Sequence, residues 1–152
     1  MNKCLVCEHE IAPFVDFGMM PIANGFVSNK DEDNGYRFPM KVGFCDQCTM
    51  VQMLEQPDRE RMFHESYAFL SSSSVNMQRH FSSVAANLID EYSLSGSSYV
   101  VEIGCNDGIF IENFVKASIP CTGVEPSGNV AKMAQEKGVP VVSKFFDRTV
   151  AA

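Results

Sequence analysis

Residues 100–110 read VVEIGCNDGIF, and this stretch decides the fold of the second half of the chain. An apolar strand runs into a loop of small residues, and the loop opens a helix. Gly104 and Gly108 lack a Cβ, so the backbone there can approach a ligand closely, and Asn106 is of the non-glycine type that best tolerates a positive φ. The stretch therefore predicts a strand–loop–helix unit that holds a bound molecule.

The spacing of the loop residues excludes two common nucleotide-binding motifs. The dinucleotide fingerprint G-x-G-x-x-G would need glycine at position 106 and glycine or alanine at 109, where the chain has Asn106 and Ile109. A P-loop is excluded because no G-K-[ST] follows. Glu125 stands about twenty residues after the loop, at the end of the next expected strand, where a carboxylate can hold both hydroxyls of a ribose. A glycine-rich turn beside an ordinary strand-end glutamate is the alternative, but the combination favours a nucleoside cofactor.

Strands and helices alternate around this unit. Three strands are expected, at Tyr99–Ile103, Cys121–Glu125 and Val139–Val142. The helices between them are expected at Ile109–Ala117 and from a capping Ser127 to Lys137, and Gly138 ends the second helix at C′. This βαβαβ order predicts a parallel, doubly wound sheet.

A further helix is expected before the first strand. Its apolar face consists of residues that recur at spacings of three and four: Met77, Phe81, Val84, Leu88 and Tyr92. Ser73 or Ser74 can cap this helix by accepting a backbone N–H.

Two C-x-x-C pairs mark the first part of the chain, where short strands and turns are expected and Asn29–Gly35 is predicted to be a polar loop. The pairs are Cys4 with Cys7 and Cys45 with Cys48. Each pair can give two thiolates to one metal ion from a tight turn, and two such turns complete the tetrahedral S4 set that zinc prefers. We interpret this zinc as structural, because four thiolates leave no open position for water.

Other uses of the cysteines fit the sequence less well. A redox dithiol needs only one C-x-x-C, normally at a helix start in a βαβ unit, and disulfides do not suit a reducing compartment. His9 is an alternative ligand, but we interpret it as a surface residue beside the site. Cys105 and Cys121 stand alone and are expected to be small buried residues, with a nucleophilic Cys105 at a helix N-terminus as the alternative.

Charge and hydropathy narrow the classes of function. The formal net charge is −7. This charge disfavours nucleic-acid binding, because a protein needs a surplus of Lys and Arg to neutralise phosphates. No apolar run approaches the roughly 18 residues of a membrane-spanning helix, and the first residues lack the apolar core of a signal peptide. We therefore expect a cytoplasmic protein with reduced cysteines and with neither nucleic-acid nor membrane partners.

These motifs together resemble a known family, the class I S-adenosylmethionine-dependent methyltransferases that carry a zinc-binding domain in front. Its members include C-methyltransferases that act on nucleotide-linked deoxysugars. The resemblance covers almost the whole chain. Besides the cysteine pairs it rests on four segments: GMMPIANGF at 18–26, YAFLSS at 67–72, VEIGCNDG at 101–108 and GVEPS at 123–127.

The resemblance implies an S-adenosylmethionine site at the glycine loop and at the end of the next strand. The residues that it assigns to the cofactor are Glu102, Gly104, Cys105, Asn106, Gly108, Glu125 and Pro126. It places Tyr67 near the cofactor and the acceptor, as the one catalytic residue in this chain, with a packed linker tyrosine as the alternative. The family often has Tyr-x-Tyr here, whereas this chain has Phe69 at the second position.

The expected organisation is an α+β zinc-binding domain at 1–65, a helical linker at 66–96, and the N-terminal part of an α/β Rossmann-like class I methyltransferase domain at 97–152. Because the family's sheet has further strands, and its catalytic His and Glu come later, we expect a chain truncated after the third strand. The strand at Tyr99–Ile103 would then have an uncovered edge.

The expected function is methyl transfer from S-adenosylmethionine to a carbon of a small-molecule acceptor, a nucleotide-linked deoxysugar or a similar compound. A non-catalytic zinc-containing interaction module left by truncation is the alternative. The sequence assigns no oligomeric state.

Overall fold

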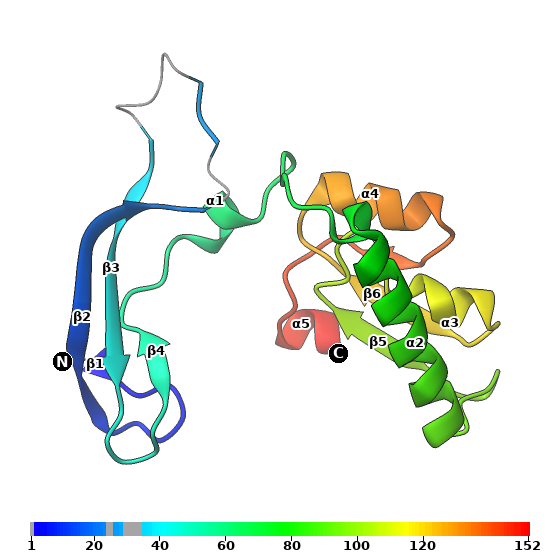
Figure 1. The fold of residues 1–152 in the computed structure, drawn as a ribbon, viewed down its shortest axis with the longest axis horizontal. Coiled ribbons are helices and arrows are strands. Elements are labelled where there is room, and N and C mark those ends of the chain that lie inside the picture. Colours follow the sequence, from blue (N-terminus) through cyan, green and yellow to red (C-terminus); the bar gives the residue numbers. More distant parts are fainter. Residues whose placement is uncertain (1, 24–25, 29–34) are drawn as a thin grey trace. The chain divides into compact units, whose positions relative to one another are not determined.

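The computed structural model describes residues 2–23, 26–28 and 35–152, which form two compact units, Met1–Met62 and Phe63–Ala152 (Figure 1). Each unit has its own sheet and its own buried cluster. The predicted loop Asn29–Gly35 lies, except for its last residue, outside the described residues.

The first unit is a four-stranded antiparallel sheet in the order β1-β2-β3-β4. Its strands are β1 (Asn2–Lys3), β2 (Glu10–Pro21), β3 (Arg37–Phe44) and β4 (Val51–Met53), and a short helix α1 (Arg59–Met62) follows. Cys4, Ile11 and Cys45 form a buried cluster against which Cys48 and Leu54 pack. Cysteines make up most of this cluster, so the stability of the unit depends on what they bind.

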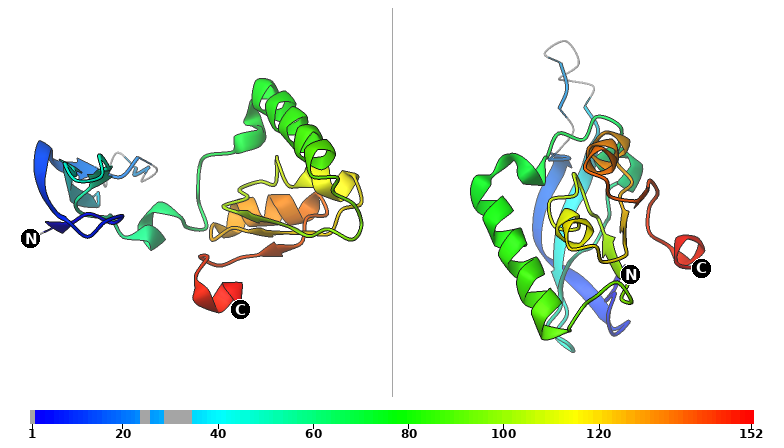
Figure 2. Two further views of the ribbon diagram at one scale, coloured as in Figure 1. Left: turned by 90° about the horizontal axis from the view of Figure 1, so that it is seen from below. Right: turned by 90° about the vertical axis from the view of Figure 1, so that its right-hand side faces the viewer.

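The second unit is built on a parallel sheet in the order β5-β6-β7. Its strands are β5 (Val100–Ile103), β6 (Cys121–Val124) and β7 (Val141–Val142). Its helices are the 3-10 helix η2 (Ser71–Ser73), α2 (Val75–Glu91), α3 (Glu112–Lys116), α4 (Gly128–Glu136) and α5 (Arg148–Ala151). The parallel pairing and the βαβαβ order confirm the predicted parallel sheet, which Figure 2 shows in two further views. The order β5-β6-β7 runs in one direction, so the described strands do not show the predicted winding in both directions.

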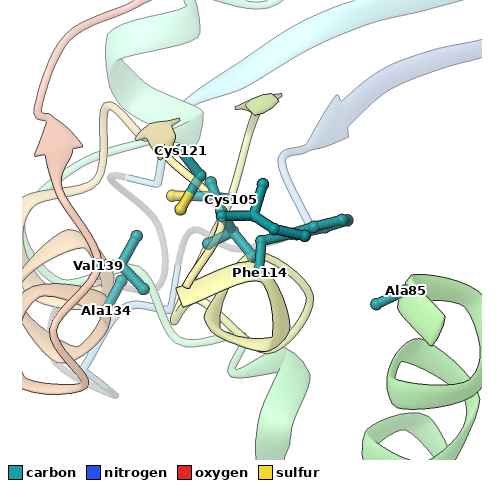
Figure 3. Packing of buried hydrophobic residues seen from close by; sticks show 8 residues of the cluster. Ala85, Cys105, Phe114, Cys121, Ala134 and Val139 are labelled. Carbon is teal, nitrogen blue, oxygen red and sulfur yellow. The ribbon is translucent and has the colours of Figure 1, made fainter. Parts of the chain in front are cut away.

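The core of this unit packs the helices against the sheet. Phe114 of α3 is 1% exposed and lies beside Cys105 and Cys121, and Ala85 of α2 belongs to the same cluster (Figure 3). Rings connect α2 to α3, because Phe110 lies 5.6 Å from Phe81 and 5.2 Å from Phe114 between centroids. Cys105 and Cys121 are therefore small buried residues, as predicted.

The predicted apolar face of α2 is confirmed in part, since Phe81, Val84 and Leu88 are half-buried. Ala85 is fully buried and Ile89 packs against the core, whereas Met77 and Tyr92 are 40% and 64% exposed. The periodicity followed the largest apolar side chains, but a close approach of two helices needs a small residue at the contact. The predicted cap is confirmed, since the Ser74 hydroxyl accepts the N–H of Met77 at 3.4 Å.

One predicted helix start is wrong, and one predicted N-cap residue is in place without its side-chain hydrogen bond. Helix α3 begins at Glu112 and not at Ile109, because turns bring both Ile109 and Ile111 into the core. Ser127 is at the N-cap of α4, but its side chain makes no capping hydrogen bond. Its backbone N–H instead donates to the Glu125 carboxylate.

The end of α4 follows the prediction. Gly138 has a φ of 85°, which an L side chain rarely adopts. Its N–H donates to Gln135 O at 2.9 Å, and the N–H of Val139 donates to Ala134 O at 3.2 Å. These two bonds make a Schellman motif, which turns the chain from α4 into β7.

One edge of the parallel sheet has no partner strand in the described part of the chain, as predicted. Strand β5 pairs with β6 alone. Tyr99, Val101 and Ile103 are 67%, 52% and 58% exposed, so one side of this strand faces solvent.

Gly104 and Gly108, in the loop after β5, have different neighbours, and this difference allows a test of how the loop packs against α4. Both Gly104 and Gly108 have a positive φ, of 78° and 80°. A Cβ at Gly108 would lie 2.9 Å from the Cβ of Ala134, while nothing lies within 4 Å of a Cβ at Gly104. We expect Gly104→Ala to cost about 1–2 kcal/mol from backbone strain alone, and Gly108→Ala to cost about 1–3 kcal/mol more from overpacking against α4.

Urea unfolding followed by the helical circular dichroism signal measures this difference, because α2 and α4, the longest described helices, belong to the second unit. Equal losses in the two variants would contradict the close approach of the loop to α4.

Candidate metal centre and cofactor site

The four cysteines of the two C-x-x-C pairs meet in the first unit. Their sulfur atoms all lie within 4.8 Å of one another, with Cys4 Sγ 3.5 Å from Cys48 Sγ and Cys7 Sγ 3.6 Å from Cys45 Sγ. All are free thiols. A tetrahedral zinc ion with Zn–S bonds of about 2.3 Å separates its sulfurs by about 3.8 Å, so this spacing fits one ion.

The two cysteine turns share one backbone construction. The N–H of Glu8 donates to Cys4 O at 3.0 Å, and the N–H of Thr49 donates to Cys45 O at 2.8 Å. Glu8 and Thr49 both have a φ of 61°. Each turn therefore presents its two sulfurs in the same way, as a symmetric tetrahedral site requires.

Gln52 links these two turns, and no sequence motif indicated this role. It is 8% exposed on β4, just after the second cysteine pair. Its Oε1 accepts the N–H of Leu5 at 2.9 Å, and its Nε2 donates to Lys3 O at 3.1 Å. One side chain from the second turn's strand thus fixes the first turn.

The electrostatics of the cluster favour a bound cation. Backbone N–H groups of Cys7 and Val6 lower the pKa of the Cys4 thiol to about 6. At Cys48 the N–H of Met50 acts in the same direction, but the neighbouring thiols and burial raise the pKa to about 12. Four thiolates this close repel one another, and a divalent ion removes that repulsion.

His9 is not one of the metal-ligating group. Its Nε2 lies 3.4 Å from Oδ1 of Asp46, and both side chains are exposed. It is a surface residue next to the cysteines, as interpreted from the sequence.

In the second unit, the loop after β5 has the backbone that its sequence predicts. Gly104, Asn106 and Gly108 all have positive φ values, and that of Asn106 is 50°. The N–H groups of Gly104 and Cys105 donate to Val124 O at 2.7 and 3.2 Å. The loop therefore leaves the sheet at the carboxyl end of β5, which is where open α/β sheets bind ligands.

Glu125 closes this loop from the neighbouring strand. It directly follows β6, it is 5% exposed, and Pro126 comes next in the chain. Its Oε2 accepts the N–H of Asn106 at 3.0 Å, and its Oε1 accepts the N–H of Ser127 at 2.8 Å. The structure thus brings the predicted carboxylate against the predicted loop.

Acidic side chains surround the base of the loop. Asp107 is fully buried, and its Oδ1 has no hydrogen-bond partner among the described residues. The same holds for Oε2 of Glu102, and burial raises the pKa of that carboxyl to about 7. A ligand group that carries positive charge or hydrogen-bond donors would complement this acidic group.

Cys105 contributes only backbone to this site. Its side chain is 1% exposed and packs against Gly123. Burial, followed by the charges of Glu102 and Glu125, raises the pKa of its thiol to about 12. The burial of the Cys105 side chain disfavours the alternative of a nucleophilic Cys105, because a reactive thiol has to be accessible.

Tyr67 lies in a segment that the loop holds by hydrogen bonds. Asn106 accepts the N–H of Ser71 with its Oδ1 at 3.0 Å and donates from Nδ2 to Phe69 O at 3.2 Å. Asp107 Oδ2 accepts the N–H of Ser72 at 2.9 Å. Asp107 was missed at the sequence level, although its place between Asn106 and Gly108 was a usable signal.

A known protein family matches the sequence of the first unit. Residues 4–63 match the model of a family described as "Putative zinc binding domain". All four cysteines of the cluster lie within the matched residues. The match and the arrangement of the four sulfurs together support these cysteines as a zinc-binding cluster.

The whole chain is similar in sequence to a methyltransferase. It is 26% identical over 152 residues to "C-methyltransferase NovU" of Streptomyces niveus. The aligned region covers 99% of this chain and 36% of that protein. The chain thus spans about a third of the length of this curated relative.

Solved structures resemble the chain over less than half its length. One is magnesium protoporphyrin IX methyltransferase (ChlM) from Synechocystis PCC 6803 with bound SAM, with TM-score 0.43, 22% identity, and coverage of 47% of this chain and 38% of that one. Another is a SAM dependent methyltransferase from Archaeoglobus fulgidus, with TM-score 0.33, 28% identity, and coverage of 44% and 29%. With both scores below 0.5, these likenesses say nothing about a ligand of this chain.

A search of the described helices for one long and apolar enough to cross a membrane found none.

We expect one equivalent of zinc per chain, and Cys45→Ser should lose it. Cys45 is fully buried at the centre of the cluster, and metal binding supplies folding free energy to small domains of this kind. Residues 1–65 should unfold in this variant more than residues 99–142, as measured by elemental analysis and amide hydrogen exchange. Cys121→Ser, a change to a cysteine outside the cluster, is the control and should keep its zinc. Purified wild-type protein without zinc and with Cys4 and Cys7 joined as a disulfide would contradict the assignment.

The raised pKa of Glu102 predicts a pH-dependent stability. The pKa of the Glu102 carboxyl is about 7 in the folded state and 4.5 ordinarily, so the folded state holds this proton more tightly than the unfolded state. The stability that Glu102 contributes is therefore full below pH 4.5 and is lost as the pH rises to 7. The glutamine of Glu102→Gln cannot ionise. The difference in urea midpoint, variant minus wild type, should therefore increase from pH 5 to pH 8. Glu136→Gln, on the exposed part of α4, is the control and should show no such gain. A constant difference between Glu102→Gln and wild type across this range would refute the assignment.

Proposed function

We propose that this chain carries the zinc-binding and cofactor-binding parts of an S-adenosylmethionine-dependent methyltransferase. The acceptor in this proposal is a carbon of a small molecule, a nucleotide-linked deoxysugar or a similar compound. The observation that carries the proposal is the buried carboxylate of Glu125, held against the Gly104–Gly108 loop at the carboxyl ends of adjacent parallel strands. The sequence similarity to a C-methyltransferase supports the reaction class.

The residues present fit this cofactor. Space is open where a Cβ of Gly104 would be, so a ligand can approach the backbone there. At Gly108 the space is filled by Ala134, so this glycine serves the packing of the loop. The unpaired acceptors of Glu102 and Asp107 suit a cofactor that carries an ammonium group and a positive sulfur.

S-adenosylmethionine, when bound, supplies a methyl group on a positively charged sulfur. The part of this chain is to bind and orient. Glu125 would accept the two ribose hydroxyls, and the backbone from Gly104 to Gly108 would line the methionine and ribose side. Tyr67 would offer its phenol on the acceptor side. We assign no general base to these residues.

Cofactor affinity should depend on Glu125. Glu125→Ala removes the acceptor of two charge-assisted hydrogen bonds, at a cost of roughly 1.5–3 kcal/mol, which is about 10- to 150-fold in affinity. Calorimetry with S-adenosylhomocysteine measures the loss, and circular dichroism checks that the fold persists. Because Glu125 also holds two backbone N–H groups, Glu125→Gln serves as a second variant of the same shape, which keeps one acceptor oxygen and loses the other. Glu136→Ala should bind like the wild type, and unchanged affinity in both Glu125 variants would sink the assignment.

The competing class of function is a zinc-containing module that serves only for interaction. It predicts one bound zinc and no measurable affinity for S-adenosylmethionine or S-adenosylhomocysteine. The same calorimetry therefore distinguishes the two classes.

A further inference from the structure

The segment Phe63–Ser73, here named the strap, crosses the carboxyl ends of all three parallel strands. The Phe63 ring lies 6.4 Å from the ring of Phe145, which follows β7. Tyr67 O accepts a hydrogen bond from Asn129, which follows β6, and Asn106 after β5 binds the strap further along. This edge of a parallel sheet is the usual ligand site, so the strap forms a wall of whatever binds there.

Tyr67 is held from three directions within the strap. Its ring lies 5.7 Å from that of Phe63, and its N–H donates to His64 O at 3.1 Å. Its carbonyl oxygen accepts from Nδ2 of Asn129 at 2.8 Å. Of these three contacts, that with Asn129 alone connects Tyr67 to a residue outside the strap.

Asn129 is suited to holding another group in place. It is the second residue of α4, whose far end is fixed by the Schellman motif at Gly138. Its Oδ1 is buried without a hydrogen-bond partner among the described residues, so the bond to Tyr67 determines which way the amide faces. A carbonyl accepts only from a donor, and the Nδ2 of asparagine supplies one.

We propose that Asn129 is the positioning residue for Tyr67, and that it sets the place of this phenol at the carboxyl edge of the sheet through the Tyr67 carbonyl. The inference rests on the proposed function, because the place of the phenol matters for turnover only if a methyl acceptor lies beside it. Asn129 itself touches neither cofactor nor acceptor in this role.

The test replaces the donor without changing the shape of the side chain. Asn129→Asp puts a carboxylate oxygen opposite Tyr67 O, and a negative charge in the first turn of α4 favours the helix, so the fold should persist. Asn113→Asp is the matched control. Asn113 is the second residue of α3, and its Nδ2 donates to Ile109 O and Phe110 O, outside the strap.

The readouts are the ring signals of 13C-labelled tyrosine, with Tyr67 assigned through Tyr67→Phe, and amide hydrogen exchange. In Asn129→Asp we expect the Tyr67 ring signals to shift and the amides of residues 67–72 to exchange about five-fold faster, as for one lost hydrogen bond. The signals of the other tyrosines should change little, and the thermal midpoint should fall because the new carboxylate is partly buried and faces a carbonyl oxygen. Asn113→Asp should leave the Tyr67 signals and the strap amides as they are.

Affinity for S-adenosylhomocysteine is measured on the same samples, and Asn129→Asp should stay within two-fold of the wild type. Tyr67 signals that do not move in Asn129→Asp, or that move equally in Asn113→Asp, overturn the role of Asn129. Absence of binding by the wild type overturns the proposed function instead, and the tyrosine signals still decide whether Asn129 places the ring.

Discussion

The carboxylate of Glu125 joins the two chain segments that leave the parallel sheet. One of its oxygens accepts the N–H of Asn106 in the loop after β5, and the other accepts the N–H of Ser127 at the start of α4. Charge-assisted bonds of this kind are stronger where water is excluded, and Glu125 is nearly buried. A loop in which Gly104, Asn106 and Gly108 all have positive φ values has no regular pairing of its own to hold it. The Glu125 carboxylate supplements the bonds that the loop makes to Val124 O and to residues 69–72, and among the described residues it alone ties the loop to the start of α4 through one side chain.

Features that depend on neighbours in the sequence could be predicted. The strand–loop–helix unit, the parallel order and the glycine at the end of α4 follow from local periodicity and from the φ preference of glycine. The cysteine cluster could also be predicted, because two C-x-x-C turns can each supply two sulfur ligands to one tetrahedral metal ion. The position of Glu125 could be predicted for the same reason, as a strand-end residue at a fixed distance from the loop.

The missed features are long-range. Asp107 binds Ser72 across 35 residues, Gln52 binds Leu5 across 47, and Asn129 binds Tyr67 across 62. Each is a polar side chain that meets a backbone group, and backbone groups are the same at every position of a sequence. Part of the buried face of α2 was misjudged for a related reason. Ala85 is buried because other residues of the core pack on it, and a small side chain does not indicate such packing in the sequence.

The two cysteine turns have a consequence for the order of events during synthesis. Cys4 and Cys7 leave the ribosome long before Cys45 and Cys48, and the first turn has no partner until the second has emerged. Once all four meet, Cys4 and Cys48 lie with their sulfurs 3.5 Å apart, where an oxidant could join them. Metal capture and oxidation then compete for the same thiols. The outcome depends on how much free zinc the newly made chain encounters, so metal supply and redox state together decide how much of the first unit reaches its folded form.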